Sequence, residues 1–411
     1  MGARTSTCRR AVHDPALHRL ERLLDMDGMR PVLARSLGGG DAITAVRGRY
    51  LRYKPGTNLR VHYEVEAGGR RHDVVVMIAA GADLLRRTRK PDNVAMARSV
   101  NGRSPAAAPL SHDRELDALV QWLPLDLALP AMVEPPSRLR GRLRAAGVDV
   151  DDSGVEPRRL AYKPHRRVVL GMDGHVVKAY ATEERYRAAE ARLRAAGSDL
   201  DVTTAQLEAA LPDLRVTVQP FLGGRPPASA AVVAHVAGAA LRALHASPVG
   251  DLDAFPPARQ HAVVTGFGEM VKAIAPGLRA RVDRLVALLE VALPRGLARV
   301  PSHGDFHAGQ LLLRDSDVAV VDFDELTAAP AALDLATFAA HELSGGEREL
   351  DAVQAMLDDL VAGYGERPAG LGWYLSALIL RRSSHPFRRL REDWPERVER
   401  MLGSAEEALG T

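Results

Sequence analysis

Apolar and polar positions follow one another along the chain in an order that predicts a mixed α+β protein. Residues 15–36 have apolar side chains at helical spacing, and 50–78 holds three β-rich runs separated by glycine-containing turns. A Ser-, Pro- and Ala-rich stretch at 99–111 predicts an exposed loop, and 113–123 is predicted as a helix. With a basic helix expected at 138–146, the first part of the chain is predicted as a small sheet flanked by helices.

The same pattern then returns. The word Tyr53-Lys-Pro reappears as Tyr162-Lys-Pro, and in both places a short strand, a glycine turn and an apolar strand follow. In the second copy the turn is Asp173-Gly174, a strong hairpin signal. The last strand of that copy carries Lys178, where the first copy has Met77. Two interpretations stay open: an internal duplication with only the second copy functional, or two unrelated hairpins that share a short word.

Lys178 stands between valine and alanine on an expected strand, where an unpartnered ammonium would be costly to bury. A helix is predicted to begin directly afterwards, with Thr182 as its N-cap. Glu190, flanked by alanines on the expected inward face, is the predicted partner of the lysine. The alternative is a lysine on an edge strand that faces water.

Length and composition narrow the class of protein. A chain of 411 residues is too long for one core, so two or three domains are expected. The formal charge of +3 gives no support to nucleic-acid binding, and no apolar run reaches membrane-spanning length. The lone Cys8 excludes an intramolecular disulfide and fits a reducing compartment, so a cytoplasmic location is expected.

The chemistry concentrates in one stretch after residue 300. It reads His303-Gly-Asp305-Phe-His307-Ala-Gly-Gln310, and an aliphatic run at 318–321 then predicts a buried strand that ends at Asp322. An acid, an amide and an acid at these intervals are hard oxygen donors of the kind that Mg²⁺ prefers. Phosphoryl transfer needs little more from a protein than a positioned hydroxyl and such cations.

This stretch resembles the aminoglycoside phosphotransferase and choline kinase family, because it is similar to that family's His-x-Asp-x-x-x-x-Asn motif. Glutamine in the last place, with His and Gly before it, is closer to the maltokinase and glucosamine kinase branch. The resemblance implies a two-lobed, protein-kinase-like α+β fold. We expect an N-terminal α/β cap at 1–135, a nucleotide-binding N-lobe with a small antiparallel sheet at 136–222, and a mainly helical C-lobe at 223–411.

The resemblance also implies roles for individual residues. Asp305 would be the catalytic base, Gln310 and Asp322 would bind Mg²⁺, and Lys178 would bind the ATP phosphates, positioned by Glu190. Main-chain groups would hold the adenine in the segment between the lobes (Gln219, Phe221, Leu222). Asp334 would be a structural cap, and the histidines of the motif are interpreted as structural.

The expected function is ATP-dependent phosphorylation of a hydroxyl on a small molecule, a sugar, amino sugar or aminoglycoside. The alternative is a non-catalytic nucleotide-binding regulator, left open by Gln310 and by the missing glycine-rich loop, in whose place 163–167 offers cations. A protein kinase is disfavoured because no Ala-Pro-Glu segment follows Asp322. Seven acids between 341 and 366 indicate either a pocket for a cationic acceptor or a solvated helix face.

Overall fold

The structure is a computed structural model that describes residues 12–38, 42–151, 154–315, 317–345 and 350–410, so Cys8 lies outside the described part. Packing groups the chain into two compact units. Unit 1 comprises residues up to 125 together with 268–282 and 383–400, and unit 2 comprises 126–267, 283–382 and 401–411. Each is described by itself. The predicted three-part division of the chain stays a prediction.

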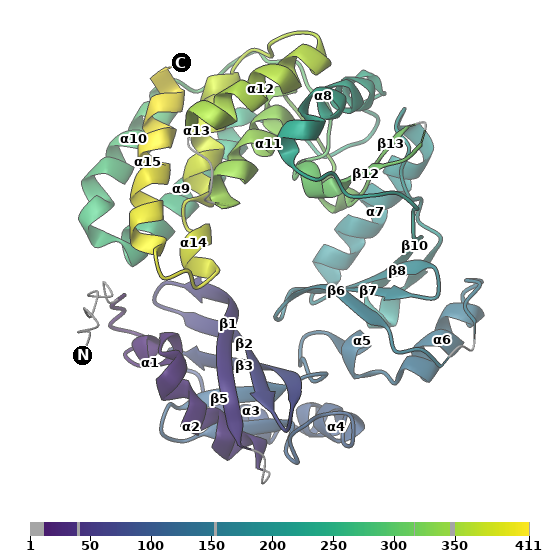
Figure 1. The fold of residues 1–411 in the computed structure, drawn as a ribbon, viewed down its shortest axis with the longest axis vertical. Coiled ribbons are helices and arrows are strands. Elements are labelled where there is room, and N and C mark those ends of the chain that lie inside the picture. Colours follow the sequence, from purple (N-terminus) through teal and green to yellow (C-terminus); the bar gives the residue numbers. More distant parts are fainter. Residues whose placement is uncertain (1–11, 39–41, 152–153, 316, 346–349, 411) are drawn as a thin grey trace. The chain divides into compact units, whose positions relative to one another are not determined.

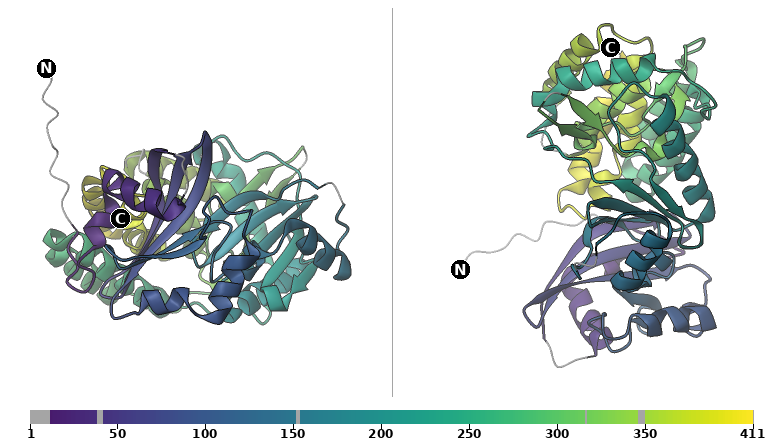
Figure 2. Two further views of the ribbon diagram at one scale, coloured as in Figure 1. Left: turned by 90° about the horizontal axis from the view of Figure 1, so that it is seen from below. Right: turned by 90° about the vertical axis from the view of Figure 1, so that its right-hand side faces the viewer.

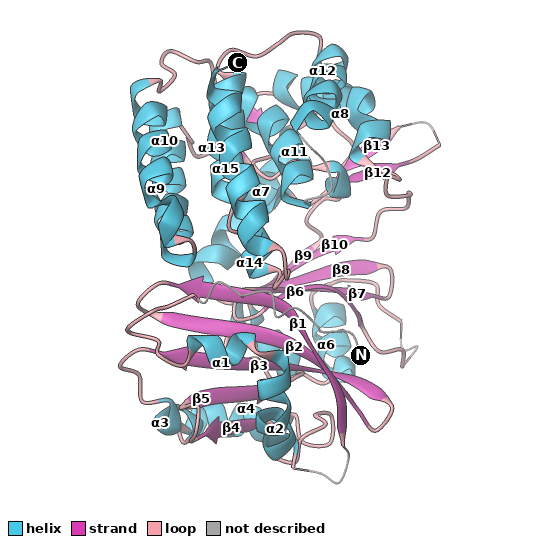
Figure 3. Ribbon diagram, turned by 60° about the vertical axis from the view of Figure 1, so that its left-hand side comes forward, coloured by secondary structure: helices cyan, strands magenta, loops and turns pink. Residues whose placement is uncertain are grey.

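Unit 1 is built on a five-stranded antiparallel sheet (Figure 1). Its order is β1-β2-β3-β5-β4, with β1 Ile43–Lys54, β2 Asn58–Ala67, β3 Arg70–Ala79, β5 Ala118–Trp122 and β4 Leu110–Asp113. Helices α1 (Leu20–Leu24) and α2 (Met26–Leu37) cover one face, where Tyr63 of β2 donates to the carbonyl of Leu23 at 2.5 Å (Figure 3). Two short helices, α3 (Leu84–Thr88) and α4 (Pro91–Ser99), follow β3.

The helix predicted at 113–123 is wrong, because this segment forms the turn into β5 and β5 itself. Val120 pairs with Val76 of β3, and every residue of β5 is buried. A short run that is apolar on both sides has no period that separates a buried strand from a buried helix. Its valine and tryptophan favour the strand.

Unit 2 begins with a second five-stranded antiparallel sheet of order β6-β7-β8-β10-β9. The strands are β6 Arg158–Lys163, β7 Arg167–Met172, β8 His175–Tyr180, β10 Val216–Pro220 and β9 Ala209–Leu211. Helix α5 (Pro130–Val133) and helix α6 (Pro136–Ala145) pack against one face through Ala131, Leu139 and Leu143. Helix α7 (Glu183–Asp199) lies on the other face, where Tyr186 packs against Tyr180 (Figures 1 and 2).

The two sheets are structural repeats of each other. Both place the fifth strand between the third and the fourth, and both receive an acid from the segment that precedes the sheet. In the first, Asp14 accepts from the Tyr53 hydroxyl at 2.7 Å and from the Gly56 amide at 2.8 Å. In the second, Asp126 accepts from the Tyr162 hydroxyl at 2.8 Å and from the His165 amide at 2.9 Å. The repeated word in the sequence therefore marks a repeated structure.

The rest of unit 2 is mainly helical, as expected, and the predicted α+β class is confirmed. Helix α8 (Ala230–Ala246) packs closely against α12 (Leu350–Tyr364), because a Cβ at Gly238 would overlap the Leu360 carbonyl oxygen. Of the remaining helices, green to yellow in Figure 2, α11 (Ala332–Gly345) and α13 (Leu371–Arg382) belong to unit 2 and α14 (His385–Arg388) belongs to unit 1. Helices α9 (Pro257–Ile274), α10 (Arg279–Val291) and α15 (Trp394–Gly410) have residues in both units. None of the described helices is both long and apolar enough to cross a membrane.

Candidate active site

Two small antiparallel pairs of strands frame the predicted catalytic stretch. Strand β11 (Val300–Ser302) pairs with β14 (Thr327–Ala329), and β12 (Leu311–Leu313) pairs with β13 (Val318–Val320). The loop, strand, turn and strand expected from the sequence are all present. His303 connects the loop after β11 with the end of β13. Its Nε2 donates to the Val321 carbonyl at 3.0 Å, and its Nδ1 accepts from the Asp305 amide at 3.3 Å. The structural interpretation of His303 is confirmed.

Asp334, at the start of α11, fixes the beginning of the loop that starts at His303. Its two carboxylate oxygens accept from the amides of His303 at 2.7 Å and Gly304 at 2.9 Å. The side chain of His245, on α8, contacts the same carboxylate at 3.1 Å. Gly304 has a φ of +81°, and a Cβ there would overlap the Glu325 carbonyl oxygen. The predicted cap role of Asp334 is therefore confirmed.

Asp305 presents its carboxylate to solvent on one side and to a buried cation on the other. Its side chain is 42% exposed, while Nη2 of Arg382 (9% exposed), from the end of α13, lies 3.1 Å from Oδ1. Burial raises the pKa of the Asp305 carboxyl, but the nearby cations, Arg382 above all and then Arg381 and Lys163, outweigh this effect and leave the pKa below its usual range. Asp305 is therefore ionised at neutral pH and free to accept a hydrogen bond.

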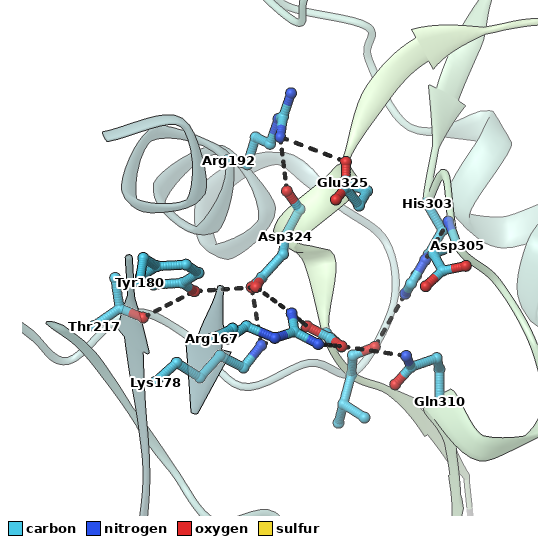
Figure 4. Close-up of polar contacts among 12 residues, drawn as sticks. Arg167, Lys178, Tyr180, Arg192, Thr217, His303, Asp305, Gln310, Asp324 and Glu325 are labelled. Atoms are coloured by element: carbon cyan, nitrogen blue, oxygen red, sulfur yellow. Dashed lines mark hydrogen bonds and ion pairs between the residues drawn. The ribbon is translucent and has the colours of Figure 1, made fainter. Parts of the chain in front are cut away.

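Asp322 follows β13 in the left-handed region, with a φ of +70°, and opens a short 3₁₀ turn (Phe323–Glu325) that also contains Asp324. A non-glycine residue held at such a φ is typical of functional sites. The Lys178 ammonium lies between the two acids, 2.6 Å from Oδ1 of Asp322 and 2.9 Å from Oδ1 of Asp324 (Figure 4). The Tyr180 hydroxyl, on the same face of β8, donates to Asp324 at 3.1 Å.

A second cation reaches the same two acids. Nη1 of Arg167 lies 2.6 Å from Asp324 Oδ2 and 3.3 Å from Asp322 Oδ1, and Nη2 lies 3.4 Å from Asp322 Oδ2. Burial alone would lower the pKa of Lys178, but the carboxylates of Asp324 and Asp322 raise it overall. Burial would likewise raise the pKa of Asp322, but Lys178 and Arg167 hold it well below its usual range. Two carboxylates and two cations therefore form one ion-paired cluster.

Oxygen donors of the right kind for a hard divalent cation are present. Asp322 and Asp324 share the Lys178 ammonium, and the amide nitrogen of Gln310 donates to Asp322 Oδ2 at 3.3 Å. The same nitrogen lies 3.3 Å from Nε2 of His307, so both contacts of the Gln310 amide are made by its nitrogen. Within the described residues no three His, Cys, Asp or Glu side chains form a metal cluster. Two carboxylates and an amide oxygen suit Mg²⁺, which takes its remaining ligands from phosphates and water.

A family model of the phosphotransferase enzyme family (APH) matches residues 152–373, more than half of the chain. The chain belongs to this family. It is thus a small-molecule phosphotransferase of the kinase-like type, with a hydroxyl group as acceptor. The maltokinase and glucosamine kinase branch is not distinguished by this match. No curated protein sequence matches the chain.

Three of the solved structures that are similar to this chain are kinases or phosphotransferases by name. A choline/ethanolamine kinase family protein from Mesorhizobium loti is 15% identical, with a TM-score of 0.48 over 67% of this chain and 95% of that one. Macrolide 2'-phosphotransferase MphH from Brachybacterium faecium is 21% identical (TM-score 0.43; 66% and 98%). The aminoglycoside phosphotransferase APH(3'')-Id from Streptomyces rimosus, in complex with ADP and streptomycin, is 18% identical (TM-score 0.42; 60% and 98%).

The predicted pairing of Lys178 with Glu190 is wrong. The carboxylate of Glu190 lies 2.8 Å from Nη2 of Arg194, one turn along α7, and Lys178 instead pairs with Asp322 and Asp324 of the turn at 322–325. The buried face of α7 follows Tyr186, Ala189 and Leu193, which leaves Glu190 at its edge. Proximity to alanines in the sequence did not define the inward face.

Helix α7 contacts the site through Arg192 and not through Glu190, and the contact is with the turn at 322–325. Nη1 of Arg192 donates to the main-chain carbonyl of Asp324 at 2.7 Å and lies 4.0 Å from the Glu325 carboxylate (Figure 4). The helix therefore positions the loop through a cation. In this phosphotransferase, the ion pair expected between β8 and α7 is replaced by ion pairs between β8 and the turn at 322–325.

The expected adenine segment is only partly free to bind a nucleotide. The Phe221 amide donates to the Gly174 carbonyl at 2.7 Å, because pairing between β10 and β8 continues for one residue beyond the strand. This main-chain donor is therefore used within the sheet, contrary to the prediction. Gln219 is buried and its side chain donates to the Ala205 carbonyl at 2.6 Å. The roles of the Gln219 and Leu222 main-chain groups stay predictions.

His307 stabilises the turn that carries Gln310. Its Nδ1 accepts from the Gly309 amide at 3.1 Å, and its ring stacks on His341 with centroids 4.0 Å apart. Burial and the neighbouring His341 lower the pKa of His307 to about 3, so the ring is neutral at physiological pH. The structural interpretation of this histidine is supported.

Tyr180, Asp324 and Arg382 contact the predicted site residues, and only some of these contacts had a signal in the sequence. Tyr180 lies two residues after Lys178, so strand periodicity places it on the same face. Asp324 lies two residues after Asp322. Arg382 is 77 residues from its partner Asp305, and nothing in the local sequence indicates this contact.

Proposed function

We propose that the protein transfers the terminal phosphoryl group of ATP to a hydroxyl group of a small sugar or amino sugar. The observation that carries this proposal is the bridge made by His303, which joins the Asp305 loop and the Asp322 strand within one hydrogen-bonded unit. Together with the contact between Gln310 and Asp322, this bridge supports a site in which the acid, the amide and the acid act on one phosphoryl group.

Asp305 orients the acceptor hydroxyl and takes its proton. Its carboxylate is ionised, partly exposed and fixed on its far side by Arg382, so the exposed side faces the acceptor. A low pKa makes Asp305 a weak base, which suits a reaction whose transition state needs an aligned nucleophile more than early proton removal.

Asp322, Asp324 and Gln310 are the residues that would hold Mg²⁺. The bound cation would neutralise charge between the nucleotide phosphates. Lys178 and Arg167 are placed beside these ligands and supply further cations for the phosphates. Lys163, at the end of β6, adds a third cation, on whose ammonium the charges of Asp305 and Asp322 act.

The acceptor is proposed as a sugar or amino sugar of the maltokinase and glucosamine kinase type, on the basis of Gln310. An aminoglycoside fits less well, because most of the described acids that indicated a cationic pocket are exposed. Asp351, Asp358 and Asp359 of α12 are exposed, and the last two pair with Arg367 and His235. Glu347 and Glu349 lie outside the described residues.

The second candidate is a regulator that binds nucleotide without transferring phosphate. One observation favours it: Lys178 and Arg167 already neutralise both metal-loop acids. Purified protein incubated with Mg-ATP and a panel of sugars, amino sugars and aminoglycosides, with phosphorylated product detected by mass spectrometry, separates the two. Product that disappears in the Asp305→Asn variant supports the kinase. Tight ATP binding without any product supports the regulator.

A further inference from the structure

The side chain of Arg167 contacts both of the carboxylates that are proposed to hold a divalent cation. It is the first residue of β7 and follows the three-residue turn Pro164–Arg166, which in this fold lies where other kinases carry a glycine-rich phosphate loop. Its guanidinium contacts both Asp322 and Asp324, as described above.

The two cations of this cluster differ in their access to solvent. The side chain of Lys178 is 6% exposed and lies between β7 and β10 in the middle of the sheet, where it is paired with Val169 and Thr217. The side chain of Arg167 is 21% exposed. Arg167 is therefore the cation on the solvent side, and the one that a ligand entering from solvent can displace.

The folding of the sheet does not require an arginine at this position. In the repeated sheet of unit 1 the corresponding first residue of the second strand is Asn58, opposite Lys54, just as Arg167 is opposite Lys163. The hairpin forms in both cases. The arginine is thus present in the sheet that lies beside Asp322 and Asp324, and the other sheet has asparagine in its place.

We propose that Arg167 is a built-in counter-ion of the metal site, which holds Asp322 and Asp324 in the absence of nucleotide and passes to the phosphates of the arriving metal–nucleotide complex. This inference rests on the proposed function. Its consequence is selective binding: free divalent metal binds poorly, and metal and nucleotide bind with positive cooperativity.

The electrostatics support this order. Two carboxylates and two cations balance, so a free divalent cation would add two positive charges to a neutral cluster beside the Arg167 guanidinium. A metal–ATP complex carries net negative charge and offers phosphate oxygens, for which the planar, two-pronged guanidinium is well suited. The displaced arginine therefore gains a new partner only when the metal arrives with the nucleotide.

The test is Mn²⁺ binding to the full-length, nucleotide-free protein, measured from the electron paramagnetic resonance signal of free Mn²⁺. We expect Arg167→Met to bind Mn²⁺ at least about tenfold more tightly than the wild type. We expect it to bind metal-free ATP more weakly. Arg167→Lys, which keeps the charge but not the two-pronged contact, should give an intermediate Mn²⁺ affinity. The matched control is Arg158→Met, an exposed arginine of the same sheet, which should change neither affinity.

The possible outcomes separate this inference from the proposed function. If Asp322→Asn removes Mn²⁺ binding but Arg167→Met and Arg167→Lys bind Mn²⁺ as the wild type does, the counter-ion role is overturned and the metal site stands. If Asp322→Asn leaves Mn²⁺ binding unchanged in both the wild-type and the Arg167→Met background, the metal site itself is wrong, and both proposals fail. A gain in Arg167→Met that Asp322→Asn abolishes supports both.

Discussion

At the scale of single residues, the site is organised by charge balance. Asp305 has Arg382, and the pair Asp322 and Asp324 has Lys178 and Arg167. Each buried charge thus has a partner, as the cost of desolvating an isolated ion requires. These cations hold the pKa values of Asp305 and Asp322 below their usual range, and the acids raise the pKa values of Lys178 and Arg167, so the site is preformed for anionic phosphates.

Replacing the proposed base tests the chemistry most directly. We expect Asp305→Asn to lower kcat by about 100-fold or more, because the amide cannot take the acceptor proton, while the Kd for ATP stays nearly unchanged. Asparagine keeps the size of the side chain and an oxygen for Arg382, so folding is preserved. Steady-state kinetics and calorimetry measure the two quantities. A variant that retains more than about a tenth of the wild-type kcat would remove Asp305 from this role.

Lys163 gives the site a pH dependence in the alkaline range. Burial and the guanidinium groups of Arg167 and Arg166 lower the pKa of Lys163 to about 8, against the opposing charges of Asp305 and Asp322. Below this pH the ammonium is charged and attracts phosphates, and above it the charge is lost. We therefore expect kcat/KM for ATP to fall as the pH rises through about 8. In Lys163→Arg, which stays charged, the same profile should be flat, and an unchanged profile in that variant would contradict the assignment.

Residue identity could be predicted from the sequence where the spacing is local, and partners could not. Asp305, Gln310 and Asp322 were found because they lie within one short stretch. The partner of Lys178 was wrong, since the acids that bind it lie more than 140 residues away and reach it only through the fold. Charge balance showed that a partner was needed, but the sequence contains many acids that could fill that need.

At the scale of elements, turns and glycines were more informative than apolar runs. The Asp173-Gly174 hairpin and the second three-stranded meander were predicted correctly, because turn chemistry is local. The segment 113–123 was assigned to a helix because pairing with β3, which makes it a strand, is not written in its own residues. The close packing of α8 against α12 also had no signal before the structure showed which glycines face each other.

The contact between α8 and α12 depends on two glycines. A Cβ at Gly238 would overlap the backbone of Leu360, and one at Gly363 would overlap the backbone of His235. We expect either alanine substitution to lower the free energy of unfolding by about 1–3 kcal/mol, because the helices must move apart. Gly266→Ala on α9, where the added methyl meets nothing within 4 Å, is the control and should be neutral or slightly stabilising. Urea denaturation measures all three, and equal effects would exclude close packing as the cause.

At the scale of the whole molecule, one sheet architecture appears twice, but only the second copy has a lysine on its third strand. The register aligns Lys178 with Met77, since each pairs with the third residue of the preceding strand (Val169 and Arg60). By the same register Tyr180 corresponds to Ala79 and Thr217 to Leu119. The positions of Lys178, Tyr180 and Thr217 are therefore all apolar in the first sheet. The sequence predicted both the repeat and the missing lysine, because the repeated word fixes the register.

Matched substitutions test whether one copy alone binds nucleotide. We expect Lys178→Met to raise the KM for ATP about tenfold or more, because it removes a buried cation from the phosphate site and leaves two acids with one partner. Lys54→Met, at an exposed position of the first sheet, should change neither KM nor kcat. Comparable losses of ATP use in both variants would show that the two sheets share one site.

The order in which the chain is synthesised gives the composition of unit 1 a further consequence. All five strands of its sheet precede residue 123, yet the unit is completed by residues 383–400. Phe387 places its ring edge-on to Tyr53 at 6.2 Å, and the Leu390 side chain lies against Gly48. During translation the sheet therefore emerges from the ribosome long before its cover, and this uncovered surface is available to chaperones and to other nascent chains. A truncated message that ends before codon 383 yields a product whose first sheet lacks this cover. We expect the exposed surface of that N-terminal sheet to direct the product to degradation.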